Sequence, residues 1–143
     1  MIRDEDSEKK SFTAQSYIQV LEKAIPACWQ PSQIFMQDNT PIHTVGVVHN
    51  WFEEQGIPLL KWPPYSPDLN PIEHLWHLMK CWLQKHHPEL CSGGKSEADW
   101  QALGKAIVEA WEAIPQSTID NLIGSMNRRC QAVIDAQGWH TKY

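Results

Sequence analysis

The sequence predicts an α/β protein with few strands, about two and parallel, and a predominantly helical C-terminal half. Two short apolar runs flank one amphipathic segment within residues 33–62, which indicates strand, helix, strand. Segments with apolar residues at helical spacing follow and predict helices over most of residues 71–137. With 143 residues, 42% of them hydrophobic, the chain suits one ordinary domain, and several of its eight tryptophans are expected in the core.

The chain begins with a charged segment that has almost no apolar periodicity. Residues 1–12 are therefore expected to form a disordered tail, and residues 13–143 a folded domain. From Phe12 to about Cys28 apolar residues recur at helical spacing, which predicts a helix that ends near Pro26.

The central segment predicts two strands around one helix. A buried strand is expected at residues 33–39, because the run Ile-Phe-Met stops at a turn-forming Asp-Asn-x-Pro sequence. Residues 44–55 have a helical pattern, and Gly56 stands where a helix C-cap would be. A second short strand, PLLKW, is expected at residues 58–62. Such a unit normally gives parallel strands, but two strands alone make a poor sheet, so further strands or a partner chain are expected at its edge.

A stiff connector leads into the helical half. It runs from Pro63 to Pro71 and contains four prolines. Three amphipathic segments follow, and Pro115 separates the last two. The predicted helices span residues 71–87, 96–114 and 119–137.

Composition and charge limit the class of protein. A net charge of −5 and a pI of about 5.7 argue against a free-standing nucleic-acid-binding module, which is usually basic. The sequence has no signal peptide, no long apolar run and no C-x-x-C pair, which favours an intracellular protein with reduced cysteines and no membrane association. Two interpretations stay open for several basic residues: a local patch that meets DNA, or solvated helix faces. These residues are Lys80, Lys85, Arg128, Arg129 and Lys142.

Two carboxylates stand at the ends of predicted elements. Asp38 follows the first strand, where ligands gather in open α/β sheets, although Asp-Asn-x-Pro is also ordinary turn chemistry. With Asn70 as N-cap and Pro71 at N1, Glu73 falls at N3, where it would complete a capping box. Two carboxylates close together would instead bind a hard divalent cation such as Mg²⁺, which is typical of phosphoryl-transfer enzymes.

Two motifs at a defined spacing resemble a known family. MQDNTPIHT at residues 36–44, followed by GIPLLKWPPYSPDLNPIEHLW at residues 56–76, resembles the catalytic domain of mariner-superfamily (Tc/mariner-type) transposases, the DDE endonucleases with an RNase H-like fold. Thirty-four residues separate Asp38 from Glu73, which matches the Asp–Glu spacing of that family. The similarity continues to GWHTKY and covers about residues 13–143.

The resemblance implies a function and a site. Asp38 would be the second catalytic carboxylate and Glu73 the third, and both would bind a two-metal Mg²⁺ (or Mn²⁺) site that cleaves phosphodiesters and joins DNA strands. His43, Asn39 and Asn70 would support that site, although roles in a turn or a helix start stay open for them. The implied partner is DNA and the implied location is the nucleus; a homo-oligomer is compatible with the family, and no membrane is implied.

The sequence departs from the family pattern at the first catalytic aspartate. In the family this residue lies on a strand upstream of the QDN motif, whereas here the 37 residues before Asp38 read as a charged tail and one helix. Asp4 and Asp6 lie in that tail without an apolar strand to hold them, so neither is assigned the role. The family's helix-turn-helix segments are also not found. We therefore expect an N-terminally truncated copy of the domain that is inactive alone; the alternative is a non-catalytic, transposase-derived interaction module.

Overall fold

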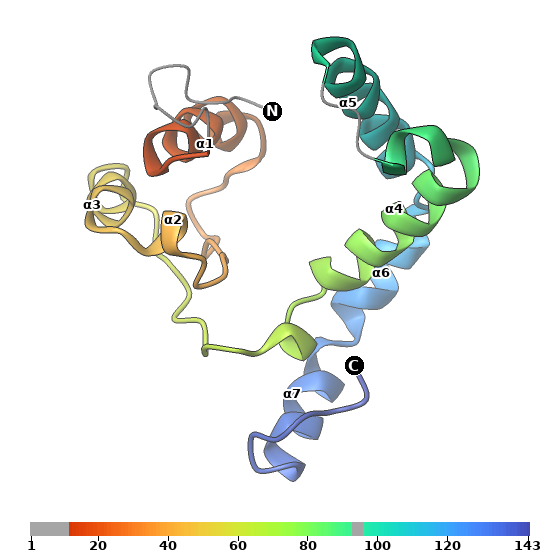
Figure 1. The fold of residues 1–143 in the computed structure, drawn as a ribbon. Coiled ribbons are helices and arrows are strands. Elements are labelled where there is room, and N and C mark those ends of the chain that lie inside the picture. Colours follow the sequence, from red (N-terminus) through yellow and green to blue (C-terminus); the bar gives the residue numbers. More distant parts are fainter. Residues whose placement is uncertain (1–11, 93–95) are drawn as a thin grey trace. The chain divides into compact units, whose positions relative to one another are not determined.

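The computed structural model describes residues 12–92 and 96–143, and their regular structure is helical (Figure 1). The charged segment with Asp4 and Asp6 lies outside the described residues. The chain divides into two compact units, Met1–Tyr65 and Ser66–Tyr143, and each is described by itself. The first unit contains α1 (Ala14–Cys28), α2 (Pro41–Thr44) and α3 (Gly46–Glu54). The second contains η1 (Pro67–Leu69), α4 (Ile72–His86), η2 (Pro88–Ser92), α5 (Glu97–Glu112), α6 (Gln116–Gly124) and α7 (Met126–Asp135).

The predicted pair of parallel strands is wrong, and with it the predicted α/β, RNase H-like fold class. No residue of the described ranges forms a β-strand; the two apolar runs meet in one parallel bridge between Phe35 and Leu59. Phe35 N donates to Pro58 O and Leu60 N donates to Phe35 O, both at 2.8 Å. The next hydrogen bond on one side of this ladder would need an N–H at residue 58, which proline lacks. A two-stranded pair this short has no third strand to stabilise it in the described part of the chain.

The helix predictions hold for three segments and need correction in two. Helices α1, α4 and α5 are confirmed, although α1 continues through Pro26 to Cys28. The helix predicted at residues 44–55 forms as α3 but begins only at Gly46, because Val45 is extended with ψ of 151°, and the short helix α2 that precedes it was not predicted. The helix predicted at residues 119–137 breaks at Ser125, whose Oγ donates to the Leu122 carbonyl at 2.6 Å. That local hydrogen bond competes with the backbone hydrogen bonds of the helix.

The core of the first unit lies between α1 and α3. Three apolar residues of α1 pack against Val48 and Phe52 of α3, which are 0% and 1% exposed. The Phe35 ring lies 5.0 Å from the Phe52 ring, so the single bridge also closes over this core. Gly56 ends α3 with φ of +65°, a left-handed conformation that favours glycine. The α1 residues are Ile18, Leu21 and Ile25.

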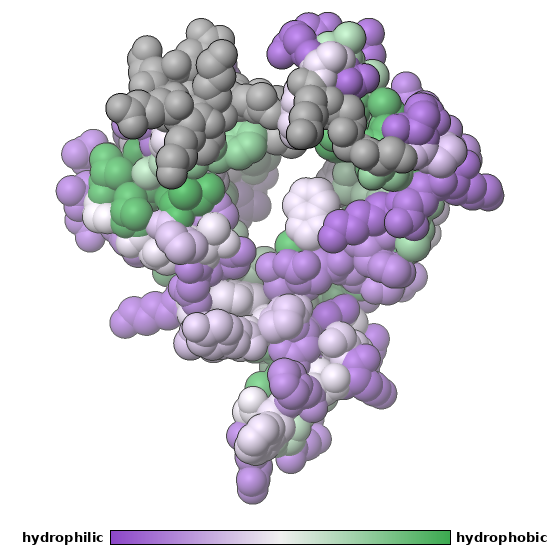
Figure 2. Space-filling model, in the orientation of Figure 1, coloured by the Kyte–Doolittle hydropathy of each residue, from purple (hydrophilic) through white to green (hydrophobic). Residues whose placement is uncertain are grey.

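The second unit has a small apolar core. Buried residues of α4 and α5, Leu75, Met79, Ala106 and Ala110, form that core where the two helices pack together. None of the eight tryptophans is fully buried; of the several expected in the core, Trp29 and Trp51 are partly buried and pack against the core of the first unit. The visible face of the molecule is mostly hydrophilic, with an apolar group over the unit that contains α1 and α3 (Figure 2). None of the helices in the described ranges has the length and apolar content that crossing a bilayer requires.

Candidate active site

Asp38 lies in the loop between the Phe35 bridge and α2, and its own turn fixes its carboxylate. Thr40 N donates to Asp38 Oδ1 at 3.0 Å, and Thr40 Oγ1 donates to Asp38 Oδ2 at 2.8 Å. An aspartate that accepts the backbone N–H two residues later forms an Asx-turn. The turn chemistry predicted for this sequence is therefore present, and it holds the carboxylate in one orientation while 45% of the side chain stays exposed.

His43 completes the hydrogen bonding of the carboxylate. Its Nδ1 lies 2.6 Å from Asp38 Oδ1. Partial burial acts to raise the pKa of Asp38, but hydrogen bonds from Thr40 and His43 outweigh it and hold that pKa below its ordinary value. Asp38 is thus ionised at neutral pH, and since an ionised carboxylate has no proton to give, the His43 Nδ1–H is the donor.

Two residues of the first unit hold His43 in turn. The Tyr17 ring of α1 lies 4.3 Å from the His43 ring, centroid to centroid. Tyr17 O–H donates to Gln37 Oε1 at 2.8 Å, and Gln37 Nε2 donates to the His43 carbonyl at 3.0 Å. Asp38 therefore sits in a connected polar network that ties α1 to α2, and such networks rigidify their members when every group is paired.

Tyr17 is expected to ionise late in an alkaline titration. Burial raises the pKa of Tyr17 to about 12, and the charge of Asp38 acts in the same direction. The folded state thus favours the protonated phenol, so this contribution to stability is complete below about pH 10 and is lost as pH rises toward about 12. Tyrosinate absorbance should show a late component that Tyr17→Phe removes and Asp38→Asn shifts to lower pH. A late component that survives Tyr17→Phe would contradict the assignment.

Asn39 does not share the hydrogen-bond partners of Asp38. Its Nδ2 donates to the Trp62 carbonyl at 3.0 Å, 23 residues further along the chain. This bond fixes the end of the PLLKW segment against the loop that carries Asp38. The contact indicates that Asn39 positions the loop rather than the carboxylate itself.

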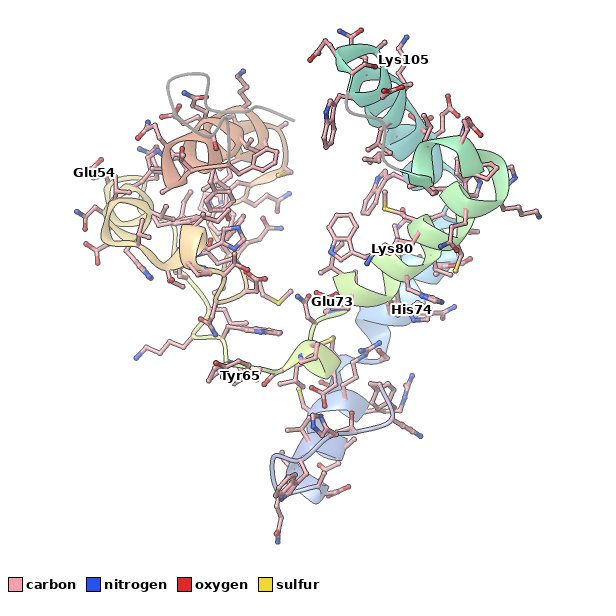
Figure 3. All side chains as sticks on the ribbon, viewed as in Figure 1. Glu54, Tyr65, Glu73, His74, Lys80 and Lys105 are labelled. Atoms are coloured by element: carbon pink, nitrogen blue, oxygen red, sulfur yellow. The ribbon has the colours of Figure 1, made fainter. Side chains whose placement is uncertain are left out.

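Glu73 lies in the first turn of α4 and is exposed (Figure 3). Asn70 is buried, and its Oδ1 accepts from Ile72 N at a long 3.4 Å. The capping box would need the Glu73 carboxylate to accept from Asn70 N, but that N–H donates to the Pro67 carbonyl at 2.9 Å. The Glu73 carboxylate has no hydrogen-bond partner anywhere in residues 12–92 and 96–143, so the capping box does not use it.

The structure therefore describes the predicted site residues in two groups. Asp38, Asn39 and His43 are gathered in the first unit, and Asn70 and Glu73 in the second. Within the part of the chain that the structure describes, no three His, Cys, Asp or Glu side chains are close enough together to hold a metal ion. Each carboxylate is available as a ligand within its own unit, and their metal-binding roles stay predictions.

Sequence reasoning missed several residues that organise these groups. Tyr17 reads as one more apolar position of a helix, and nothing in its spacing indicates a bond to Gln37. The role of Thr40 could have been predicted, because a threonine two residues after an aspartate is suited to an Asx-turn. Thr141 donates to the Asp68 carboxylate at 3.0 Å across 73 residues, a separation that local patterns cannot reveal.

Comparison with known proteins places these motifs in a family. A family model described as DDE superfamily endonuclease matches residues 6–93, a segment that includes Asp38 and Glu73. The Tc1 transposase of Caenorhabditis elegans is 48% identical over 110 residues, which are 77% of this chain and 37% of that protein. The Tcb1 transposase of Caenorhabditis briggsae is 43% identical over 112 residues, 78% of this chain and 38% of that protein.

A third relative agrees at lower identity. The Tc3 transposase of Caenorhabditis elegans is 36% identical over 107 residues, 73% of this chain and 30% of that protein. The matched segments thus span between 30% and 38% of the length of these three relatives. Since the family model covers more than half of the chain, the family is established. The chain belongs to the DDE superfamily endonucleases, as a DDE domain of the Tc1/mariner transposase type.

Proposed function

We propose that this chain serves metal-dependent DNA cleavage and strand transfer in transposition, with Asp38 and Glu73 as metal-binding carboxylates. The observation that carries the proposal is the state of Asp38, an ionised and half-exposed carboxylate that three hydrogen bonds hold in one orientation. It lies in the segment that the family model matches, and the relatives are named as transposases of transposable elements. DNA is then the substrate and the nucleus the place of action.

The donor atoms fit a hard divalent cation. Asp38 Oδ1 accepts two hydrogen bonds, whereas Oδ2 accepts one and keeps a lone pair for a cation. Glu73 has no hydrogen-bond partner among the described residues. Mg²⁺ and Mn²⁺ prefer such oxygen donors, and Mg²⁺ needs only one or two protein carboxylates beside water and phosphate oxygens. When bound, these ions would acidify an attacking water and neutralise charge on the phosphoryl oxygens.

The residues around Asp38 would keep it ready to bind a cation. Thr40 and His43 fix the carboxylate before a ligand arrives, so little conformational freedom is lost on binding. The lowered pKa keeps Asp38 ionised, which a ligand to a hard cation must be. His43 therefore acts as a positioning residue through Asp38.

We expect no Mg²⁺-dependent nicking of supercoiled plasmid by these 143 residues alone. The family site uses three carboxylates, and the motif positions in this chain supply two, which leaves a metal ion poorly held. The measurement is the conversion of supercoiled to open-circular plasmid, with Asp38→Ala as the matched control. Equal background in both proteins is the expected result. Nicking by the wild-type chain that Asp38→Ala abolishes would show that the two carboxylates suffice.

Exposed apolar side chains favour a second candidate, a non-catalytic interaction module that pairs with a second copy of the chain. Ile123, Ile134 and Trp139 are 61%, 68% and 75% exposed within the second unit. Sedimentation equilibrium of the wild-type chain and Trp139→Gln tests this candidate. A dimer that Trp139→Gln dissociates would support the module, and a monomer at all concentrations would exclude self-association.

A further inference from the structure

The second unit contains a pocket of about 600 Å³ that the proposed metal chemistry uses only in part. Its lining includes Glu73 and His74 of α4, residues of α6 and α7 and the last residues of the chain. Figure 3 labels Glu73 and His74 on α4. Two of the lining residues are cationic, Arg129 and Lys142, and Asn121 adds an amide. The pocket thus combines two cations with neutral polar groups and one acidic side chain, Glu73.

Arg129 is a buried cation without an ion pair. It is 6% exposed, and no carboxylate in the described ranges lies within ion-pairing distance of it. Its Nε donates to Ser125 Oγ and its Nη1 donates to the Asp68 carbonyl, both at 2.8 Å. These neutral acceptors satisfy hydrogen bonds but do not neutralise the charge, which is costly to bury without an anion.

One donor group of Arg129 is left without a protein partner in the described part of the chain and reaches solvent. Nη2 has no hydrogen-bond partner among the described residues, and every fully buried side-chain nitrogen or oxygen there has one. Nη2 is therefore reached by solvent, and because Arg129 lines the pocket, an anion there can accept from it. The planar fork of guanidinium donors suits phosphate oxygens in particular.

Lys142 brings a second cation to the same place. The Tyr143 ring lies 4.8 Å from Arg129 Cζ and 5.5 Å from Lys142 Nζ, so the two cations share one aromatic ring. The nearby Asp68 carboxylate accepts from Thr141 Oγ1 at 3.0 Å, and Glu73 is the acidic side chain that lines the pocket. His74 and His77 line it as well.

We propose that this pocket binds a phosphate group of a DNA strand through Arg129 and Lys142. The phosphate chemistry follows from the pocket itself, and the choice of DNA rests on the proposed function. A chain with net charge −5 repels DNA overall, so contact requires a local concentration of positive charge. The rival role for Arg129 is structural, because its bond to the Asp68 carbonyl also ties α7 to η1.

The test is binding of a fluorescein-labelled DNA duplex to the full chain in EDTA, followed by anisotropy over a range of salt concentrations. Lys142→Gln and Arg129→Gln are each expected to weaken binding several-fold and to lower the slope of log affinity against log salt by about 1. Arg128→Gln is the matched control, because it removes the same charge from the exposed neighbouring residue. Its effect on affinity should be less than about twofold, since a solvated charge makes no phosphate contact.

Further variants and a second measurement separate a DNA site from a structural role of Arg129 and from binding of a free anion. Lys142 is exposed, so Lys142→Gln keeps the fold and tests the pocket even if Arg129→Gln unfolds the unit. Because EDTA removes divalent cations from the assay, a failure of the metal proposal would leave this result intact. Equal losses for Arg128→Gln and Lys142→Gln would overturn the pocket assignment. A further measurement is the ³¹P line width of inorganic phosphate mixed with the wild-type chain or with Lys142→Gln. If the wild type broadens the line and Lys142→Gln does not, while the salt slope for DNA binding is the same in both, the pocket binds a free anion and the DNA proposal is overturned.

Discussion

Replacing Asp38 with asparagine is expected to weaken Mn²⁺ binding by at least about tenfold, and replacing Glu73 with glutamine is expected to do the same. Loss of groups that merely orient ligands already costs about 10- to 100-fold in metal affinity, so loss of a ligand should cost no less. Both substitutions keep the size of the side chain and remove its charge. The measurement is the loss of the free Mn²⁺ signal in electron paramagnetic resonance as protein is added.

Glu54→Gln is the control for these two substitutions, because it removes an exposed carboxylate from the end of α3 (Figure 3). Its Mn²⁺ affinity should equal that of the wild type. His43→Phe should lie in between, since it removes one hydrogen bond from Asp38 but leaves Oδ2 in place. Equal affinities in Asp38→Asn and Glu54→Gln would show that the bound Mn²⁺ reports only general negative charge.

Replacing Phe52 with alanine is expected to destabilise the first unit by about 3–5 kcal/mol. Phe52 is 1% exposed and contacts the Phe35 ring and the Trp51 ring, so its removal leaves a cavity between α1 and α3. A loss of this size is comparable with the whole stability of a small domain. Chemical denaturation should show a transition at lower denaturant, and hydrogen exchange should localise the loss to the unit that ends at Tyr65.

Val47→Ala provides the comparison for that substitution. Val47 lies on the same helix but is 49% exposed, so the expected change is within about 0.5 kcal/mol. Similar losses for the two variants would mean that α3 does not bury Phe52 in solution as the structure describes.

The sequence predicted helix starts well, because the residues that begin a helix act through their immediate neighbours. Asn-Pro placed the start of α4 within about one turn, and the helix predicted from residue 96 begins at Glu97, where Ser96 and Asp99 form a capping box. The same local logic failed at residues 58–62, where apolar, β-prone residues predicted a strand. Pro58 contributes to this failure, because it lacks the N–H that would continue the ladder beyond the single bridge on one side.

Site residues could be predicted from the sequence when their partners lie nearby in the chain, and not when their partners are distant. Asp38 and Glu73 follow from two motifs and their spacing, and the turn at Thr40 follows from its neighbours. Arg129 could be read only as a charge on a helix, because its burial depends on an acceptor 61 residues away. Tertiary burial of a charged side chain leaves no local pattern, and the pocket around Arg129 is therefore visible only in the folded structure.

Iron-directed cleavage of the protein tests most directly whether both carboxylates are metal ligands. Fe²⁺ can occupy a site of oxygen donors, and with ascorbate and peroxide it generates radicals that cut the backbone near the ion. If both carboxylates are ligands, cuts are expected close to Asp38 and close to Glu73. Asp38→Asn should remove the cut near Asp38 and Glu73→Gln the cut near Glu73, whereas Glu54→Gln should keep both and excess Mg²⁺ should suppress both. Cuts that avoid both segments, or that persist unchanged in both carboxylate variants, would contradict the assignment of these carboxylates as ligands.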